Sequence, residues 1–410
     1  MKLWHKKDTR QNAQQLINFL LSEHSGSGLP IEWKTMAALE ELSYSAQAPL
    51  SHRVILRILN KMVEDGLNNV EDFEQIYKKL QHGTKRKADI KRWRYLLPLE
   101  LEIPKDKLPV RLQIFGKRYY LISSSSFKRY LKPKSLQSLS FALSSNCSFQ
   151  KKIDRYVYFS ALADAPNWNF GWKQSVSSAF DAFRGMLNLT LSFYQWRLTF
   201  NAVKSWGIKA PCWGVALTQD EDVPFFFLGE RGCTSKFVEI SEKTIEALKK
   251  NLFLLNKYPQ QGSTLELIAD ALRLYAQAMD TSLPDWRFLG FWQLAEAITI
   301  SEDVGGDTTK VAHRLSWLGP RIGLEASGYR YTLVALGKQR NQFVHKGIGK
   351  VEEEDINILK LACEAGIHWL FSVVKDLPTI QHIKQFYRLK DINQKERQSI
   401  KQVLEFINNL

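Results

Sequence analysis

A short polar segment, KYPQQGS at residues 257–263, divides the chain into two parts that require different secondary structure. A proline and a glycine so close together favour a linker over a helix or strand. Before this segment, helical patterns alternate with runs of β-branched and aromatic residues. After it, the apolar residues recur at helical spacing. The sequence therefore predicts an α+β N-terminal region followed by an all-α helical bundle.

The 410 residues are enough for two or three domains. We expect a basic domain of mixed helices and strands at residues 1–150. An α+β middle domain follows at residues 151–262, either separate from the first or continuous with it. Residues 263–410 should form the helical bundle, with a tail helix that ends near residue 408.

Periodicity and turn residues place the expected elements. In the N-terminal region we expect a strand at 156–165, a long helix at 173–198, and further helices at 9–24, 35–43 and 51–66. VRLQIF and RYYLI should form a hairpin with a two-residue turn at Gly116-Lys117, and CWGVAL and VPFFFL a second hairpin around the acidic turn 220–222. The bundle helices are expected at 263–280, 285–300, 306–318, 330–344 and 352–376.

The cysteines and the N-terminus indicate a cytoplasmic protein. Cys147, Cys212, Cys233 and Cys363 lie far apart and form no C-x-x-C pair, so neither a zinc site nor a disulfide framework is expected. The charged start MKLWHKKDTR leads into no apolar stretch typical of a secretion signal. We also expect no membrane span, no metal site and no cofactor.

Positive charge is concentrated in the first part of the chain. Of the net charge of +15, residues 1–150 contribute +11, because 25 lysines and arginines stand against 14 acidic residues. The densest basic run is TKRKADIKRWR at residues 84–94. Such a run can neutralise phosphates, and Trp93 within it could stack on a base; the alternative is an exposed helix face with Trp93 in the core. The candidate nucleic-acid-binding residues are Lys85, Arg86, Lys87, Lys91, Arg92 and Arg94.

The helix expected at 51–66, SHRVILRILNKMVEDG, is clearly amphipathic. Its pattern resembles the second helix of a winged helix-turn-helix, which would make the chain a DNA-binding regulator. An ordinary packing helix has the same pattern, so DNA binding is an alternative function here.

The segment KQRNQFVHKG contains the residues best suited to chemistry, Arg340, Asn341 and His345. Histidine can transfer protons near neutral pH, and arginine can stabilise a charged phosphoryl group. On a regular helix, Asn341 and His345 share a face, whereas Arg340 and His345 point about 140° apart. The two can therefore act on one substrate only if the helix distorts near its end or a second subunit completes the site.

This motif, followed by Gly347, resembles that of the HEPN superfamily, and in particular its Apea-like branch. The helix FLGFWQLAEAIT, with Glu296 inside it, is similar to the corresponding helix of that branch. The resemblance covers about residues 263–376, and the segment 301–329 is an insertion relative to compact members. It implies a HEPN-like bundle that forms a homodimer, with Arg340, Asn341 and His345 as catalytic residues and Glu296 in support.

HEPN domains are commonly metal-independent endoribonucleases of toxin–antitoxin and antiviral systems. The resemblance thus implies RNA as substrate and an antitoxin or trigger protein as a further partner. Residue chemistry agrees, because RNA cleaves when its 2′-hydroxyl attacks the adjacent phosphate, which requires proton transfer and charge stabilisation. The alternatives are an inactive HEPN-like module for RNA binding or dimerisation, and a structural role for His345 at a helix end.

Overall fold

The chain forms two compact units, residues 1–90 and residues 91–410. The computed structural model describes residues 7–23, 38, 42, 52–84, 90–133, 135–137, 139, 153–198, 207–211, 213–218, 222–227, 237–257, 259–318, 326–346 and 351–408. The predicted domain boundaries near residues 150 and 262 both fall inside the second unit.

The first unit is helical where it is described. Its main helices are α1 (Lys7–Ser22), α3 (His52–Glu64) and α4 (Val70–Thr84), which confirms the helices predicted at 9–24 and 51–66. The apolar face of α3 is fully buried between its neighbours. Gln14 links α1 to the start of α4, since its side chain accepts a hydrogen bond from Val70 N (2.7 Å). Most of the helix predicted at 35–43 lies outside the described residues.

The second unit begins with a six-stranded antiparallel sheet in the order β3-β4-β5-β1-β6-β7. The long strands β1 and β5 pair along their whole length at its centre. β2 (Leu101–Glu102) and β8 (Val238–Glu239) form a separate parallel pair. The sheet strands are β1 (Lys91–Leu99), β3 (Val110–Ile114), β4 (Lys117–Ile122), β5 (Val157–Ala165), β6 (Trp213–Leu217) and β7 (Asp222–Phe227).

The predicted hairpins and the strand at 156–165 are confirmed, but the first turn lies one residue earlier than predicted. Ile114 pairs with Lys117, so Phe115 and Gly116 form the turn. Both have positive φ, 51° and 74°, as a tight two-residue hairpin turn requires. Phe115 is held in this conformation by its N–H, which donates to Leu255 O (2.7 Å). Residues 220 and 221 of the acidic turn lie outside the described residues.

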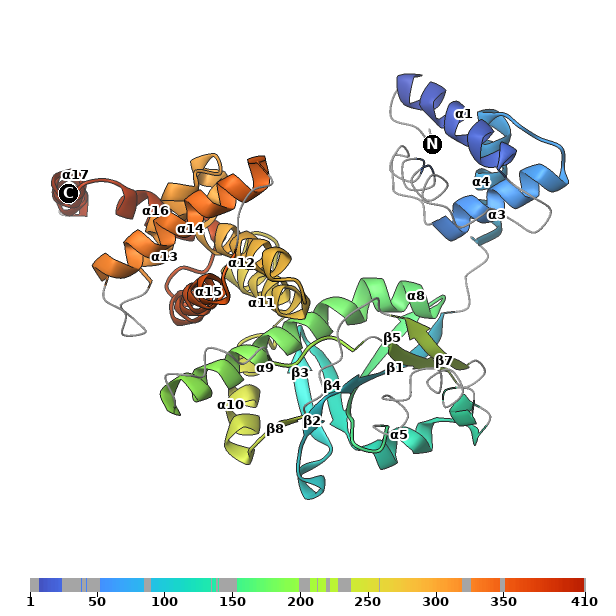
Figure 1. Cartoon of the computed structure of the whole chain (residues 1–410), viewed down its shortest axis with the longest axis horizontal. Coiled ribbons are helices and arrows are strands. Elements are labelled where there is room, and N and C mark those ends of the chain that lie inside the picture. The colour runs from blue at the N-terminus through green and yellow to red at the C-terminus, as the bar shows by residue number, and fades with distance from the viewer. Residues whose placement is uncertain are drawn as a thin grey trace. The chain divides into compact units, whose positions relative to one another are not determined.

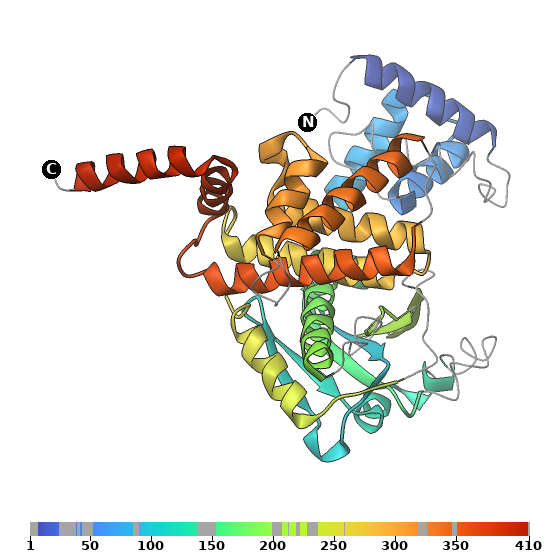
Figure 2. The same ribbon diagram turned by 60° about the vertical axis from the view of Figure 1, so that its left-hand side comes forward.

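Helices cover both faces of the sheet. Trp93, Tyr95 and Leu97 belong to the large core that also contains α9 (Ser177–Leu198), and Figures 1 and 2 show this long green helix running across the sheet. Leu96 and Trp213 point to the other face, where α5 (Ser124–Tyr130) packs. The helix predicted at 173–198 is present; α8 (Trp168–Gly171) and a π-helical turn (Trp172–Val176) precede α9.

The same core continues from the sheet through α9 into the helices that follow. Gly185 of α9 lies against α11 (Thr264–Asp280), where a Cβ atom would overlap the Leu272 carbonyl oxygen, so only glycine permits this close approach. Buried Arg184 also joins the two helices, donating to Asp280 Oδ1 and Oδ2 at 2.6 and 2.9 Å. The sheet and the bundle therefore share one hydrophobic core.

The C-terminal half is helical where it is described, and all five predicted bundle helices are confirmed. The single predicted tail helix is instead two helices, because the chain turns at Asn393, whose side chain accepts a hydrogen bond from Glu396 N (2.9 Å). Besides α11, the elements are α12 (Pro284–Thr299), η4 (Ser301–Val304), α13 (Thr308–Ser316), α14 (Ala326–Lys346), α15 (Glu353–Val373), α16 (Ile380–Asp391) and α17 (Gln394–Asn408). α10 (Glu242–Phe253) precedes them and packs on α9.

α15 is long and apolar enough to span a membrane. Most of its apolar residues are buried against α12 and the other helices of the bundle. Its hydropathy is thus explained by its position as a core helix.

Candidate functional site

Arg340 lies on α14 and is held by two neighbouring side chains. Its Nη2 donates to Glu296 Oε1 of α12 at 3.1 Å, and its Nη1 donates to Asn341 Oδ1 at 3.2 Å. The side chains of Arg340 and Glu296 are only 24% and 23% exposed. The structure therefore brings together three of the four residues predicted for the site, across 44 positions of sequence.

Two further residues fix this arrangement. Trp292 Nε1 donates to the same Glu296 oxygen at 3.0 Å. Asn341 Nδ2 donates to Thr308 Oγ1 at 3.0 Å, which connects α14 to the first turn of α13. The result is one hydrogen-bonded chain across three helices, from Trp292 through Glu296, Arg340 and Asn341 to Thr308.

Local sequence explains why these helices meet here. Asp307 caps α13 by accepting hydrogen bonds from Thr309 N and Lys310 N, which begins that helix at Thr308. On α14, Gly337 faces both partners: a Cβ there would lie 3.1 Å from Trp292 Cη2 and 3.4 Å from Thr308 Cβ. The absence of a side chain at residue 337 thus lets α14 approach α12 and α13.

His345 lies near the end of α14 and is exposed. α14 is helical without interruption as far as Lys346, so Arg340 and His345 are separated by about 140° around the axis and about 7.5 Å along it. Within one chain the structure does not bring them to a common point. Among the interactions of the described residues, none involves the His345 side chain.

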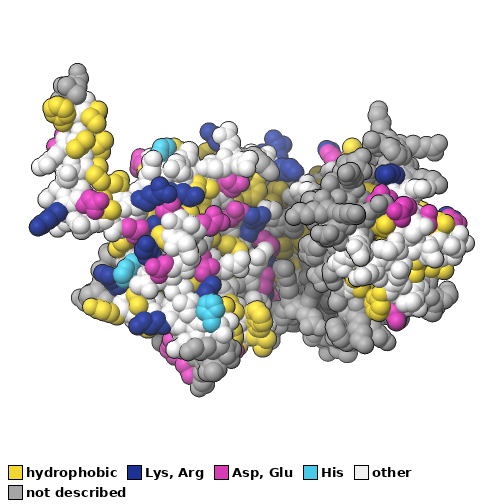
Figure 3. Space-filling view, turned by 90° about the horizontal axis from the view of Figure 1, so that it is seen from above, with side chains coloured by type: hydrophobic (Ala, Val, Ile, Leu, Met, Phe, Trp, Pro, Cys, Tyr) yellow, Lys and Arg dark blue, Asp and Glu magenta, His cyan; other side chains and the backbone are white. Residues whose placement is uncertain are grey.

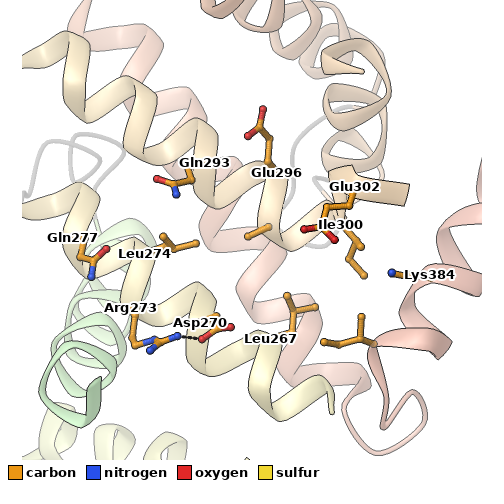
Figure 4. A pocket seen from close by; sticks show the side chains of 12 residues that line it. Leu267, Asp270, Arg273, Leu274, Gln277, Gln293, Glu296, Ile300, Glu302 and Lys384 are labelled. Carbon is orange, nitrogen blue, oxygen red and sulfur yellow. Dashed lines mark hydrogen bonds and ion pairs between the residues drawn. The ribbon is translucent and has the colours of Figure 1, made fainter. Parts of the chain in front are cut away.

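A cavity of about 620 Å³ lies beside Glu296, between α11, α12, η4 and α16 (Figure 4). Its charged side chains are nearly balanced, with Arg273 and Lys384 against Asp270, Glu296 and Glu302. Arg273 is moreover paired with Asp270. Since Arg340 does not line this cavity and its net charge is not positive, the cavity does not favour a polyanion.

Where it is described, the basic run at 84–94 is a strand and not a helix, and the alternative prediction that Trp93 lies in the core is confirmed. Lys85, Arg86 and Lys87 lie outside the described residues, whereas residues 91–94 belong to the central strand β1 rather than to a helix. Pairing with β5 and β6 imposes the strand, and alternate residues point into the core.

Burial changes the roles expected for this run. Trp93 is buried, with its Nε1 donating to Ala165 O (3.2 Å), so it is not a surface on which a base could stack. Arg92 pairs with Asp164 at 3.0 Å, and the Arg94 guanidinium lies 4.3 Å from the centre of the Tyr130 ring. Lys91 is partly exposed at the start of β1.

Charged and titratable residues outside this motif also have contacts with neighbouring side chains. Lys61 of α3 forms exposed ion pairs with Glu64 (3.3 Å) and Asp65 (2.9 Å). His313 Nε2 lies 3.0 Å from Arg330 Nη2, and burial together with that cation lowers the pKa of the His313 imidazole.

Among the described residues, no three of His, Cys, Asp and Glu form a group that could hold a metal ion.

Sequence reasoning missed Trp292 and Thr308. Trp292 precedes Glu296 by four residues on a predicted helix, so the i,i+4 spacing was a usable signal. Thr308 carried no such signal, because its contact with Asn341 spans 33 residues. It belongs to the segment 301–329, so part of this segment contacts the motif.

Searches of protein-family models, curated proteins and solved structures found no match to this chain. The resemblance to the HEPN superfamily therefore depends on the motif residues themselves.

Proposed function

We propose that this chain is a metal-independent endoribonuclease of the HEPN type. The observation that carries the proposal is the contrast between two residues of one helix. Arg340 is held in place by Glu296 and Asn341, whereas His345, little more than a turn away, is exposed and has no contact among the described residues. An anchored cation with an accessible imidazole suits charge stabilisation combined with proton transfer.

The chemistry requires no other group from the protein. The RNA 2′-hydroxyl attacks the adjacent phosphorus, forms a 2′,3′-cyclic phosphate and releases the 5′-oxygen of the next nucleotide. His345 removes the hydroxyl proton while a water molecule protonates the leaving oxygen, or water accepts the first proton while His345 supplies the second. In both cases Arg340 donates hydrogen bonds to the phosphoryl oxygens. Glu296 and Asn341 occupy two of the five guanidinium N–H donors and set the direction of the others.

A two-fold dimer could bring Arg340 and His345 together although they diverge within one chain. Because α14 keeps its helical form through Lys346, Arg340 and His345 of one chain diverge. Two α14 helices facing each other would place Arg340 of one chain near His345 of the second. We therefore propose a homodimer whose sites are shared between the chains.

In the cell, we propose that the protein cuts cytoplasmic RNA as a toxin or antiviral defence effector. Its N-terminal part would bind RNA or respond to an antitoxin or trigger protein. An inactive HEPN-like module would bind RNA or dimerise without cleavage. A DNA-binding regulator that uses α3 is the second alternative.

The test is cleavage of total RNA by the purified full chain in EDTA. Arg340→Ala and His345→Ala should each reduce the rate about 10²–10⁴-fold. Gln342→Ala, at an exposed position of the same helix, is the matched control and should cleave normally. The products should carry 2′,3′-cyclic phosphate or 3′-phosphate ends.

Folding must be measured in parallel by urea unfolding. His345→Ala should change the free energy of unfolding by no more than about 0.5 kcal/mol, as for other exposed residues. Cleavage lost in EDTA, 5′-phosphate products or full activity of His345→Ala would each overturn the proposal. Tight RNA binding without cleavage would instead support the inactive module.

A further inference from the structure

A second cavity, of about 460 Å³, lies between the sheet and the helices α9 and α11. Its wall is formed by the turn between β3 and β4, by β4 itself, by the start of α9, by the linker before α11 and by α11. It shares Asp270 and Arg273 with the cavity beside Glu296. Its volume lies within the range of about 300–1,000 Å³ that is usual for small-molecule sites.

Tyr119 of β4 lines this cavity with a hydroxyl that has no hydrogen-bond partner among the described residues. The residue is only 2% exposed, and its ring stacks on Phe159 with 5.2 Å between the ring centres. Buried polar groups are usually hydrogen-bonded, so this hydroxyl favours a partner that occupies the cavity. Burial raises the pKa of the Tyr119 hydroxyl to about 12, so it is protonated near neutral pH and can donate to a ligand.

The cavity wall contains further uncharged polar side chains. Ser178 Oγ accepts a hydrogen bond from Arg273 Nη1 (3.3 Å), so the hydroxyl proton of Ser178 can be donated to a ligand. Three more such residues line the cavity, and each can both donate and accept: Gln174, Ser175 and Gln261. A ligand hydroxyl has the same dual capacity. Several hydroxyl groups therefore match this wall better than a group that can only donate or only accept.

The charged side chains of the wall balance one another. Two cations stand against two carboxylates: Lys117, Arg273, Glu266 and Asp270. Arg273 is paired with Asp270, and Glu266 Oε2 accepts a hydrogen bond from Gly262 N (2.7 Å). Figure 3 shows a similar balance on the face that it draws, where the coloured basic and acidic side chains are interspersed over the bundle at the left. A wall without net charge favours an uncharged ligand, because a charged one would lose its hydration without an excess of opposite charge.

We propose that this cavity binds an uncharged small molecule that carries several hydroxyl groups. Nucleosides and short sugars share this chemistry. A base or a sugar ring can also pack against Phe115, which lines the cavity and is partly buried. Tyr119 donates to one ligand oxygen, and the serine and glutamine side chains bind other hydroxyl groups. This site is separate from the α14 motif and does not depend on nuclease activity.

The first test measures binding of adenosine, uridine and maltose to the full chain by saturation-transfer NMR. Binding of the two nucleosides alone would identify nucleosides as the ligand class, and binding of maltose alone would identify sugars; either result supports the proposal. Adenosine monophosphate should bind to this cavity more weakly than adenosine, because its charged phosphate must be desolvated. Failure of all three uncharged probes to bind at millimolar concentration would overturn the proposal.

The second test locates the binding with variants. Tyr119→Phe removes only the hydroxyl and should weaken binding about two- to tenfold, as expected for one hydrogen bond. Ser178→Ala should weaken binding by a similar factor. Tyr120→Phe is the matched control, because Tyr120 packs on the opposite face of the sheet and should bind like the parent.

Folding is checked by urea unfolding of the same variants. Tyr119→Phe should keep the urea midpoint of the parent, because the Tyr119 hydroxyl has no hydrogen bond to a described residue to lose. Equal affinities of the parent, Tyr119→Phe and Ser178→Ala would overturn the proposal. So would adenosine monophosphate binding that is tighter than that of adenosine and is lost in Tyr119→Phe.

Discussion

Arg340 Nη2 lies 3.1 Å from Glu296 Oε1, and Trp292 Nε1 donates to the same oxygen at 3.0 Å. The carboxylate therefore binds the guanidinium on one side and is itself fixed on the other. Only about a quarter of either charged side chain is exposed, so solvent weakens the pair less than at an open surface. In the proposed mechanism, this contact makes Glu296 a positioning residue that holds Arg340 in one direction before RNA binds.

Removing that contact should slow cleavage without removing the chemistry. Glu296→Ala should lower the single-turnover rate of RNA cleavage by up to about a hundredfold, since a misdirected catalytic group costs roughly that much. Glu296→Gln keeps an acceptor for Arg340 and should retain more activity than Glu296→Ala. Gln293→Ala is the control, because Gln293 lines the neighbouring cavity on the same helix, whereas the hydrogen bonds of Arg340 go to Glu296 and Asn341. A faster rate in Glu296→Ala would show that the carboxylate competes with the phosphate instead.

The basic residues should divide into two groups when RNA binding is measured against salt. Changing Lys85, Arg86 and Lys87 together to Ala should flatten the plot of log affinity against log salt by about 0.7–0.9 for each lost phosphate contact. Arg92→Ala with Arg94→Ala should change the slope less, because Arg92 is paired with Asp164 and Arg94 stacks on Tyr130. Equal slopes for the parent and the triple variant would remove residues 85–87 from the interface.

The predicted fold was most accurate where local periodicity determines structure. The helices α11 to α15 each bury a stripe of apolar residues, and the sequence placed all five. It did not place β1, because Lys91, Arg92 and Arg94 suggested a solvated segment. Their strand conformation is imposed by pairing with β5 about 70 residues later, which no local pattern reveals.

In the candidate site, too, local sequence identified some residues, and others depend on tertiary contacts. Arg340, Asn341 and His345 were found by their chemistry and by the resemblance of their spacing to a family motif. Glu296 came from the resemblance alone, and its contact with Arg340 depends on how α12 packs against α14. Thr308 was missed because a hydroxyl at the start of a helix is common, and only the tertiary fold brings it to Asn341.

Acid should destabilise the fold partly through His368. Burial lowers the pKa of its imidazole below the ordinary value, although Glu364 opposes the shift. Above about pH 6.5 the imidazole is neutral in both the folded and the unfolded state, so it does not change the free energy of unfolding. As the pH falls below that value, the unfolded chain binds the proton first, so the free energy of unfolding decreases until the folded-state pKa has been passed.

The measurement is the urea midpoint at pH 7.5 and pH 5.5. The parent should lose more stability between these values than His368→Gln, which cannot titrate at this position. Ser372→Ala, one turn later on α15, should behave like the parent. The same loss in His368→Gln and in the parent would show that other groups account for the pH dependence.

Mixing two inactive variants tests whether the site is shared between chains. Arg340→Ala retains His345, and His345→Ala retains Arg340, so a mixed dimer would contain one complete site and one empty site. If equal amounts exchange subunits freely, half of the dimers are mixed, and about a quarter of the parental activity should return. The rates should be measured after co-refolding, with each variant refolded alone as the control. If a site were built within one chain, every chain in the mixture would lack one group, and no activity would return. Because α14 remains a continuous helix through Lys346 and its two reactive side chains diverge, we expect the activity to return.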